Sequence, residues 1–170
     1  MRIISTFMLL LFFSMISSSI GLAKEMEYNH ESITIEEVKK EVDFQVLIPE
    51  KIPSEWSLEI KTYEHNDENM GTIRLHYMDS TDENIMLGIE ERKVSEKEIR
   101  QLEEEFSNRD KINVNGAEAY YQEWANSGRK LNGKRMNGGL LTWIQGETYL
   151  QMDSSILTKD EMVEIARTVR

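Results

Sequence analysis

Apolar and polar residues alternate along three neighbouring stretches of the chain. In residues 58–63, 73–78 and 85–90 one alternate set of positions is mainly apolar, and short polar runs separate the stretches. A period of two is typical of a β-strand that buries one face. Because the links are short and polar, we expect three consecutive antiparallel strands with one dry face.

Two hairpin patterns occupy the later half of the chain. In each, two strand-like stretches flank a two-residue turn that contains glycine, Asn115-Gly116 in the first and Gly146-Glu147 in the second. The four predicted strands are 111–114, 117–125, 140–145 and 148–153. We expect residues 126–139, between the hairpins, to form a glycine-rich loop.

Three stretches combine a helical apolar stripe with a capping box, in which a Ser or Thr and a Glu three residues later bond each other's backbone amides. The pairs are Thr34 with Glu37, Ser95 with Glu98, and Thr158 with Glu161. The resulting order of elements lacks the βαβ alternation of parallel sheets. It favours an α+β fold: an antiparallel β-sheet of about six to seven strands, with an N-terminal and a C-terminal helix packed on one face. We expect one domain over residues 34–170 after a flexible lead-in over 24–33.

Both prolines of the chain, Pro49 and Pro53, lie between the first helix and the first strand. Each proline fixes its own φ and pushes the preceding residue into an extended conformation. We therefore expect residues 44–56 to form a stiff extended corner rather than a helix. The apolar side chains predicted to pack against the core are Phe44, Ile48, Ile52 and Trp56.

The first residues have the three parts of a secretory signal peptide. Met1-Arg2 gives a basic start, the uncharged run from Ile3 to Ala23 gives an apolar centre, and small residues precede a cut after Ala23. We expect residues 1–23 to be removed on export, which makes the protein secreted or extracytoplasmic. The alternative is a retained membrane anchor over residues 3–23, which is long enough to span a bilayer.

Charge and cysteine content narrow the class of protein. The net charge is −11, which argues against nucleic-acid binding because phosphate contacts need a basic surface. The chain has no cysteine, so neither a disulfide nor a lipid on an N-terminal cysteine can hold it. Contact with a membrane is expected only through the signal segment, if that segment is not cleaved.

The proline corner and the later strands resemble an uncharacterised domain family. The stretches that carry the resemblance are 35–38, 44–58, 114–120, 141–143, 149–152, 157–161 and 165–166. The family occurs in exported proteins, lipoproteins and anti-sigma-factor ectodomains of spore-forming Gram-positive bacteria. The resemblance implies an extracytoplasmic accessory or sensory domain without an agreed activity. Because this chain lacks a lipobox cysteine and a cytoplasmic sigma-binding part, it would be a free-standing copy.

Four aromatic side chains on the predicted later strands are candidates for ligand binding: Tyr120, Trp124, Trp143 and Tyr149. On antiparallel strands they could line a shallow groove for a peptide, a glycan or a lipid. The competing interpretation is that half of them fill the core, because aromatic side chains dominate cores.

A basic loop on this acidic protein carries Arg129, Lys130, Lys134 and Arg135. It comes close to a phosphate-binding P-loop, but Arg135 stands where a magnesium-binding hydroxyl is required. The four cations could contact a polyanion such as wall teichoic acid or lipid headgroups. The alternative is a solvated hairpin tip.

No familiar catalytic apparatus is visible in the sequence. It has no nucleophile elbow, no cysteine and no closely spaced histidines, so we assign no catalytic residue, metal or cofactor. The turn 79–84 offers oxygen ligands but lacks the glycine and the distal glutamate of a calcium loop. Adjacent acids such as Glu90 and Glu91 fall on opposite faces of a strand.

These observations favour an exported, non-enzymatic binding or accessory domain that acts at the cell envelope on an unknown protein or envelope component. One alternative is a secreted hydrolase whose carboxylate pair only the fold brings together. Another is a sensory factor for envelope stress or sporulation.

We predict that the exported protein begins at Lys24. N-terminal sequencing of the exported form, run beside the intact chain on a denaturing gel, measures this directly. An exported form that still begins at Met1 would contradict cleavage and favour the anchor.

Overall fold

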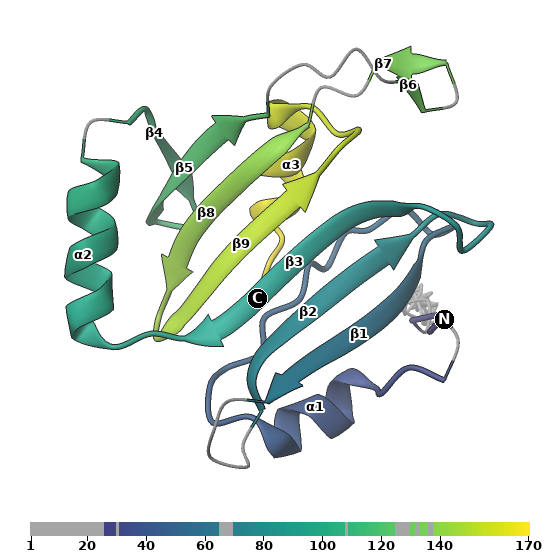
Figure 1. Cartoon of the computed structure of the whole chain (residues 1–170), viewed down its shortest axis with the longest axis horizontal. Coiled ribbons are helices and arrows are strands. Elements are labelled where there is room, and N and C mark those ends of the chain that lie inside the picture. Colours follow the sequence, from purple (N-terminus) through teal and green to yellow (C-terminus); the bar gives the residue numbers. More distant parts are fainter. Residues whose placement is uncertain are drawn as a thin grey trace, which may run out of the picture.

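Seven strands form one antiparallel sheet in the computed structural model, which describes residues 26–29, 31–64, 70–107, 109–124, 130–131, 133–135 and 138–170. The strands are β1 Ser57–Glu64, β2 Met70–Met78, β3 Ile85–Lys93, β4 Lys111–Val114, β5 Ala117–Glu123, β8 Gly139–Gln145 and β9 Thr148–Ser154. The predicted α+β fold with an antiparallel sheet is therefore confirmed (Figure 1). The predicted signal peptide, 1–23, lies outside these residues. None of the helices described has the length and apolarity needed to cross a membrane.

The strand order across the sheet is β1-β2-β3-β9-β8-β5-β4. The chain makes the predicted meander from β1 to β3, and then leaves the middle of the sheet through α2, Glu96–Phe106. It forms the β4–β5 hairpin at the far edge and returns with β8 and β9, so that β9 pairs with β3. The last strand thus fills the centre of the sheet.

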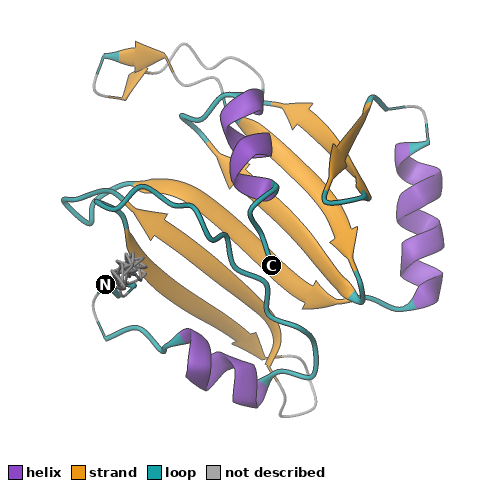
Figure 2. Ribbon diagram, turned by 180° about the vertical axis from the view of Figure 1, so that it is seen from behind, coloured by secondary structure: helices purple, strands orange, loops and turns teal. Residues whose placement is uncertain are grey.

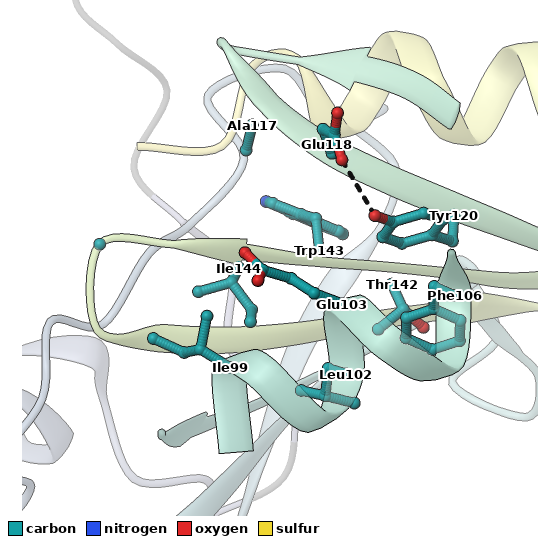
Figure 3. Close-up of a pocket in the computed structure, with 11 residues that line it drawn as sticks. Ile99, Leu102, Glu103, Phe106, Ala117, Glu118, Tyr120, Thr142, Trp143 and Ile144 are labelled. Atoms are coloured by element: carbon teal, nitrogen blue, oxygen red, sulfur yellow. Dashed lines mark hydrogen bonds between the residues drawn. The ribbon is translucent and has the colours of Figure 1, made fainter. Parts of the chain in front are cut away.

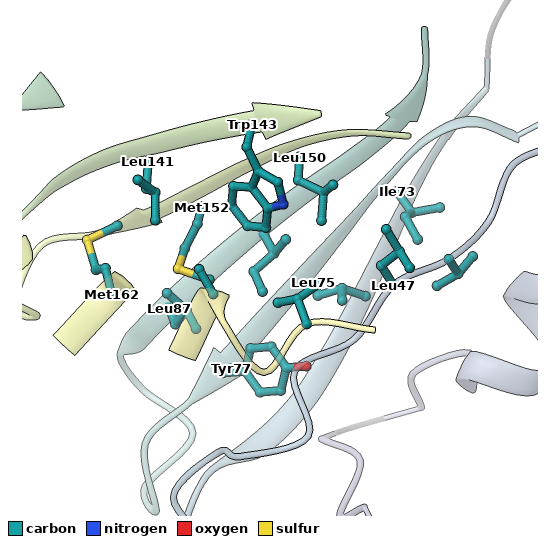
Figure 4. Close-up of a cluster of buried hydrophobic side chains, with 14 of the residues drawn as sticks. Leu47, Ile73, Leu75, Tyr77, Leu87, Leu141, Trp143, Leu150, Met152 and Met162 are labelled. Atoms are coloured by element: carbon teal, nitrogen blue, oxygen red, sulfur yellow. The ribbon is translucent and has the colours of Figure 1, made fainter. Parts of the chain in front are cut away.

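The register places one row of mostly apolar residues across six strands. The successive partners are Ile60, Leu75, Ile89, Met152, Leu141 and Tyr121. Residues directly opposite each other share a face of the sheet, so this row and its neighbours make one inner face. Ile89 is fully buried there. So are Leu75, Met152 and Leu141 (Figure 4).

The inner face is covered by α1, Ile35–Glu41, by α3, Lys159–Ala166, and by the extended segment between α1 and β1 (Figure 2). Val38 of α1 and Met162 of α3 are fully buried and belong to the same cluster as the strand residues. The N-terminal and C-terminal helices therefore contribute to one core.

All three predicted capping boxes are present, at the N-caps Thr34, Ser95 and Thr158. In each, the N-cap side chain accepts from the backbone of the glutamate three residues on, and that glutamate accepts from the N-cap backbone. Accepting these hydrogen bonds lowers the pKa of Glu37 and of Glu98. The starts of the helices are thus encoded by residues within one turn.

The predicted corner at 44–56 is confirmed. Phe44 and Trp56 are buried, and Ile48 and Ile52 are half-buried against the core. The first strand begins directly after Trp56. The corner therefore delivers the chain to the edge of the sheet as part of the core.

Two neighbours hold this segment from opposite sides. The backbone of Ile48 exchanges two hydrogen bonds with the backbone of Arg170, each of 3.0 Å. From the sheet, the hydroxyl of Thr148 donates to the carbonyl of Gln45 over 2.8 Å. The segment is thus fixed between the C-terminal tail and β9.

Two stretches of the chain that show no clear alternation of apolar and polar residues also form β-type backbone pairings. In the predicted lead-in, residues 27–29 bond to β1: the Leu58 amide donates to the Glu27 carbonyl, and the Asn29 amide donates to the Leu58 carbonyl, both over 2.8 Å. The predicted loop 126–139 contains a small hairpin of β6, Lys130–Leu131, and β7, Lys134–Arg135. Such short pairings carry too few residues to show a period.

Leu47→Ala is expected to lower the free energy of unfolding by about 2–5 kcal/mol. Leu47 is 1% exposed, so its truncation removes apolar contacts and leaves a cavity between the segment and the sheet. Urea denaturation measures the loss. The matched control Lys51→Ala, exposed on the same segment, should change stability by less than about 0.5 kcal/mol. Equally small losses in both variants would show that the segment lies outside the core.

Candidate functional site

The outer face of the sheet is polar and uncovered over β1, β2, β3 and β9 (Figure 1). Across it, Lys61, Arg74 and Glu90 are successive partners. Arg74 pairs with Asp153 and lies 4.0 Å from a carboxylate oxygen of Glu90. Because these charges pair with one another, this part is a solvated sheet face.

A groove lies at the other end of the outer face, where α2 packs over β5 and β8. It has a volume of about 290 Å³ (Figure 3). Its main apolar and aromatic lining residues are Ile99, Leu102 and Phe106 of α2 and Tyr120 and Ile144 of the sheet. Ile99 and Leu102 are only half-buried, so the helix leaves part of its apolar stripe accessible.

Two strands separate beside this groove. Pairing between β5 and β8 ends at Ala119 and Trp143, although β5 begins at Ala117 and β8 continues to Gln145. Over this divergence β5 is paired with β4, and β8 with β9. Ala117 and Trp143, on its two sides, both line the groove. The groove therefore reaches to the opening between the strands.

Phe106 and Tyr120 form an aromatic wall of the groove. Their rings stack with centroids 4.7 Å apart, and the guanidinium of Arg109 lies 4.9 Å from the Phe106 centroid. The Tyr120 hydroxyl donates to a carboxylate oxygen of Glu118 over 3.1 Å (Figure 3). Burial and the bond to Glu118 raise the pKa of Tyr120, so this hydroxyl keeps its proton.

Two exposed carboxylates lie at the rim, on Glu103 and Glu118. Glu118 pairs with Lys111 over 2.7 Å, and this contact is the main cause that lowers the pKa of Glu118. Glu103 makes no ion pair or hydrogen bond within the residues that the structure describes. The indole N–H of Trp143 is buried and has no partner there either. The rim of the groove thus carries one exposed carboxylate, on Glu103, without a partner among the described residues.

The four predicted aromatic residues do not converge on one site. Tyr120 is part of the groove wall, and Trp143, 1% exposed, is a core residue that also lines the groove. Trp124 follows β5 and is 38% exposed. Tyr149 lies beneath Arg92, whose guanidinium carbon is 4.4 Å from the ring centroid. Alternation explains the separation, because Trp143 points to the inner face while Tyr120 and Tyr149 point outward.

Sequence reasoning missed the contribution of α2 to the site. The stripe of Ile99, Leu102 and Phe106 follows a helical period, which by itself indicates only the side on which a helix packs. The signal that could have found the groove is the narrowness of this stripe on a helix with otherwise charged faces. A narrow stripe covers little of the strands below it.

The basic loop is only partly within the described residues. Arg129 lies outside them. Lys130 is exposed on β6 and stands opposite Arg135 of β7, and Lys134 stands opposite Leu131. Three of the four predicted cations therefore belong to one small hairpin.

The acids that the sequence singled out have defined surroundings. As predicted, Glu90 and Glu91 point to opposite faces: Glu91 is fully buried, and Glu90 lies on the open face. In the turn 79–84, Asp79 accepts hydrogen bonds from Asn84 and Thr81, which lower its pKa to about 2. Among the residues that the structure describes, no three His, Cys, Asp or Glu side chains are arranged to hold a metal ion.

Comparison with known proteins gives one family match. Residues 46–169 match the model of DUF4367, a domain of unknown function. Among curated proteins nothing matches. A crystal structure from Bacteroides thetaiotaomicron is similar over 68% of this chain and 44% of that chain, with 12% identity and a TM-score of 0.37; this chain thus spans less than half of that one. The family match covers most of the chain, and it confirms an uncharacterised domain family: the chain belongs to the DUF4367 family.

Proposed function

We propose that this chain is an exported, non-enzymatic binding domain that acts at the cell envelope, and that the groove between α2 and the strands β5 and β8 receives a peptide segment of a partner protein. The observation that carries the proposal is an apolar groove that stays accessible beside a filled core. Concave, mainly apolar sites with a few convergent polar groups are the usual form of a binding site.

The size and chemistry of the groove favour a segment with one bulky apolar residue next to a basic residue. Its volume of about 290 Å³ is near the lower end of ligand pockets and suits a single large side chain. The exposed carboxylate of Glu103, which has no ion-pair partner among the described residues, complements a Lys or Arg of the segment.

The surroundings of the groove acids support a binding role over the hydrolase alternative. A general acid at neutral pH needs a raised pKa, which burial provides. Glu103 and Glu118 are exposed, and Lys111 lowers the pKa of Glu118. The buried acid, Glu91, is on the opposite face of the sheet. These positions do not favour proton transfer by a carboxylate pair in this groove.

Export and action at the envelope are supported by the sequence. Residues 1–23 have the composition of a signal peptide. The resemblance to extracytoplasmic domains of spore-forming Gram-positive bacteria supports the same compartment. A partner protein in that compartment would have access to the groove.

Panning a displayed library of random octapeptides against the exported chain should enrich segments that carry a large apolar residue beside Lys or Arg. Leu102→Asp, which places a carboxylate in the apolar lining, should then weaken the enriched peptide at least tenfold, about 1.4 kcal/mol of binding free energy. Titration calorimetry measures both affinities.

The matched control for this experiment is Gln101→Asp, at an exposed neighbouring position of the same helix outside the groove lining. It should bind like the wild type. Glu103→Gln should reduce the salt dependence of binding, because one charge pair is lost. Failure to enrich any sequence, or equal affinities of Leu102→Asp and the wild type, would refute the groove as the site.

A further inference from the structure

A carboxyl group lies inside the core, at the contact between the sheet and the extended segment 44–56. Glu91 of β3 is fully buried and stands in register with Ile73 and Leu150, which are fully buried too. It is the one acidic or basic side chain that is buried in the described part of the chain. Burying such a group is costly unless hydrogen bonds compensate it.

One carboxyl oxygen of Glu91 has a partner and the other has none. Oε2 accepts a hydrogen bond from the backbone amide of Leu47 over 3.0 Å, whereas Oε1 is buried without a partner among the described residues. Among the described residues the hydroxyl of Tyr77 on β2 is likewise buried without a partner, and Glu91 and Tyr28 both act on it electrostatically. One amide compensates a charged carboxylate poorly, and a neutral carboxyl is less costly to bury than a charged one.

Few charged groups face Glu91. Lys39 of α1 attracts its charge, while Tyr77 is held neutral by burial, which raises the pKa of that phenol. Lys93, the next inward-facing residue of β3, is paired with Asp43 over 3.0 Å. Burial outweighs both the hydrogen bond from the Leu47 amide and the attraction of Lys39, and it raises the pKa of Glu91 to about 8.

We propose that Glu91 is a proton-dependent latch on the segment 44–50: the neutral carboxyl can stay buried while the segment is closed on the sheet, whereas the ionised carboxylate is costly to bury and favours opening of the segment. The C-terminal tail is fastened through the same segment, because Ile48 exchanges two backbone hydrogen bonds with Arg170. The latch is independent of the proposed peptide groove, which lies on the outer face.

The direction of the effect follows from proton binding. When the segment opens, Glu91 reaches solvent and its pKa returns to its ordinary value of 4.5. Between pH 4.5 and about 8, the closed state holds a proton that the open state has lost. Opening therefore becomes about tenfold more favourable per pH unit in this window. Above about pH 8 the dependence ends, because both states are ionised.

Hydrogen-exchange mass spectrometry on the exported chain tests the latch. After correction for intrinsic exchange, protection of peptides that cover 44–50 should fall about tenfold per pH unit between about pH 5.5 and 7.5, and level off above about pH 8. Peptides from the centre of β2 and β3 serve as the internal reference. Glu91→Gln keeps the acceptor but cannot ionise, so it should abolish the slope. Glu90→Gln, on the open face of the same strand, should retain it.

A wild-type chain without this slope, or a slope that persists in Glu91→Gln, would overturn the latch. Should Glu91→Gln not fold, a carbon-13 NMR titration of the Glu91 carboxyl in the wild-type chain decides alone. A midpoint near 8 supports the latch, and a midpoint near the ordinary 4.5 overturns it.

Discussion

The structure depends on how the apolar inner face of one large sheet is shielded from water. Seven strands present a continuous apolar face, and the two helices that lie on it have only 7 and 8 residues. Such short helices cannot cover seven strands, because each adds about 1.5 Å of length per residue. The extended segment 44–56 completes the cover, and its two prolines keep it extended. Its backbone is fastened to the C-terminal tail, so the two ends of the domain close the core together.

The same constraint shapes the outer face. Since β9 fills the centre of the sheet, the chain must leave from β3 and start again at the far edge with β4. The helix α2 is the link that makes this passage, and its narrow apolar stripe rests on strands that already diverge beyond Ala119 and Trp143. The groove is therefore a consequence of topology: a connecting helix packs over the end of the sheet where two strands part. The inner core is complete only when β9, the last strand in the sequence, pairs with β3 and β8. Such non-local pairing is typical of sheets with high contact order.

Much of the fold could be predicted from the sequence because its signals are local. The period of two located the first three strands of the main sheet, the two hairpin turns located the other four, and the capping boxes located the three helix starts. The strand order could not be predicted, because nothing local indicates that β9 pairs with β3. Alternation predicted that Glu91 points away from Glu90, but not that the proline segment buries it. The groove was missed because the separation of β5 from β8 is a tertiary feature.

The buried carboxyl and the groove lie on opposite faces, and β3 is their nearest common element. Glu91 points inward to the segment 44–50, whereas the adjacent Arg92 points outward, pairs with Glu98 of α2 over 3.0 Å and covers Tyr149. Adjacency of this kind is not coupling, which requires an element with two arrangements. Because β3 is paired with β2 from Ile85 to Arg92 and with β9 from Gly88 to Lys93, it has little freedom to shift. The segment 44–50 lies on the sheet surface rather than within it, so it is the element that can move. Recognition in the groove and proton binding at Glu91 are therefore best treated as separate properties of the two faces.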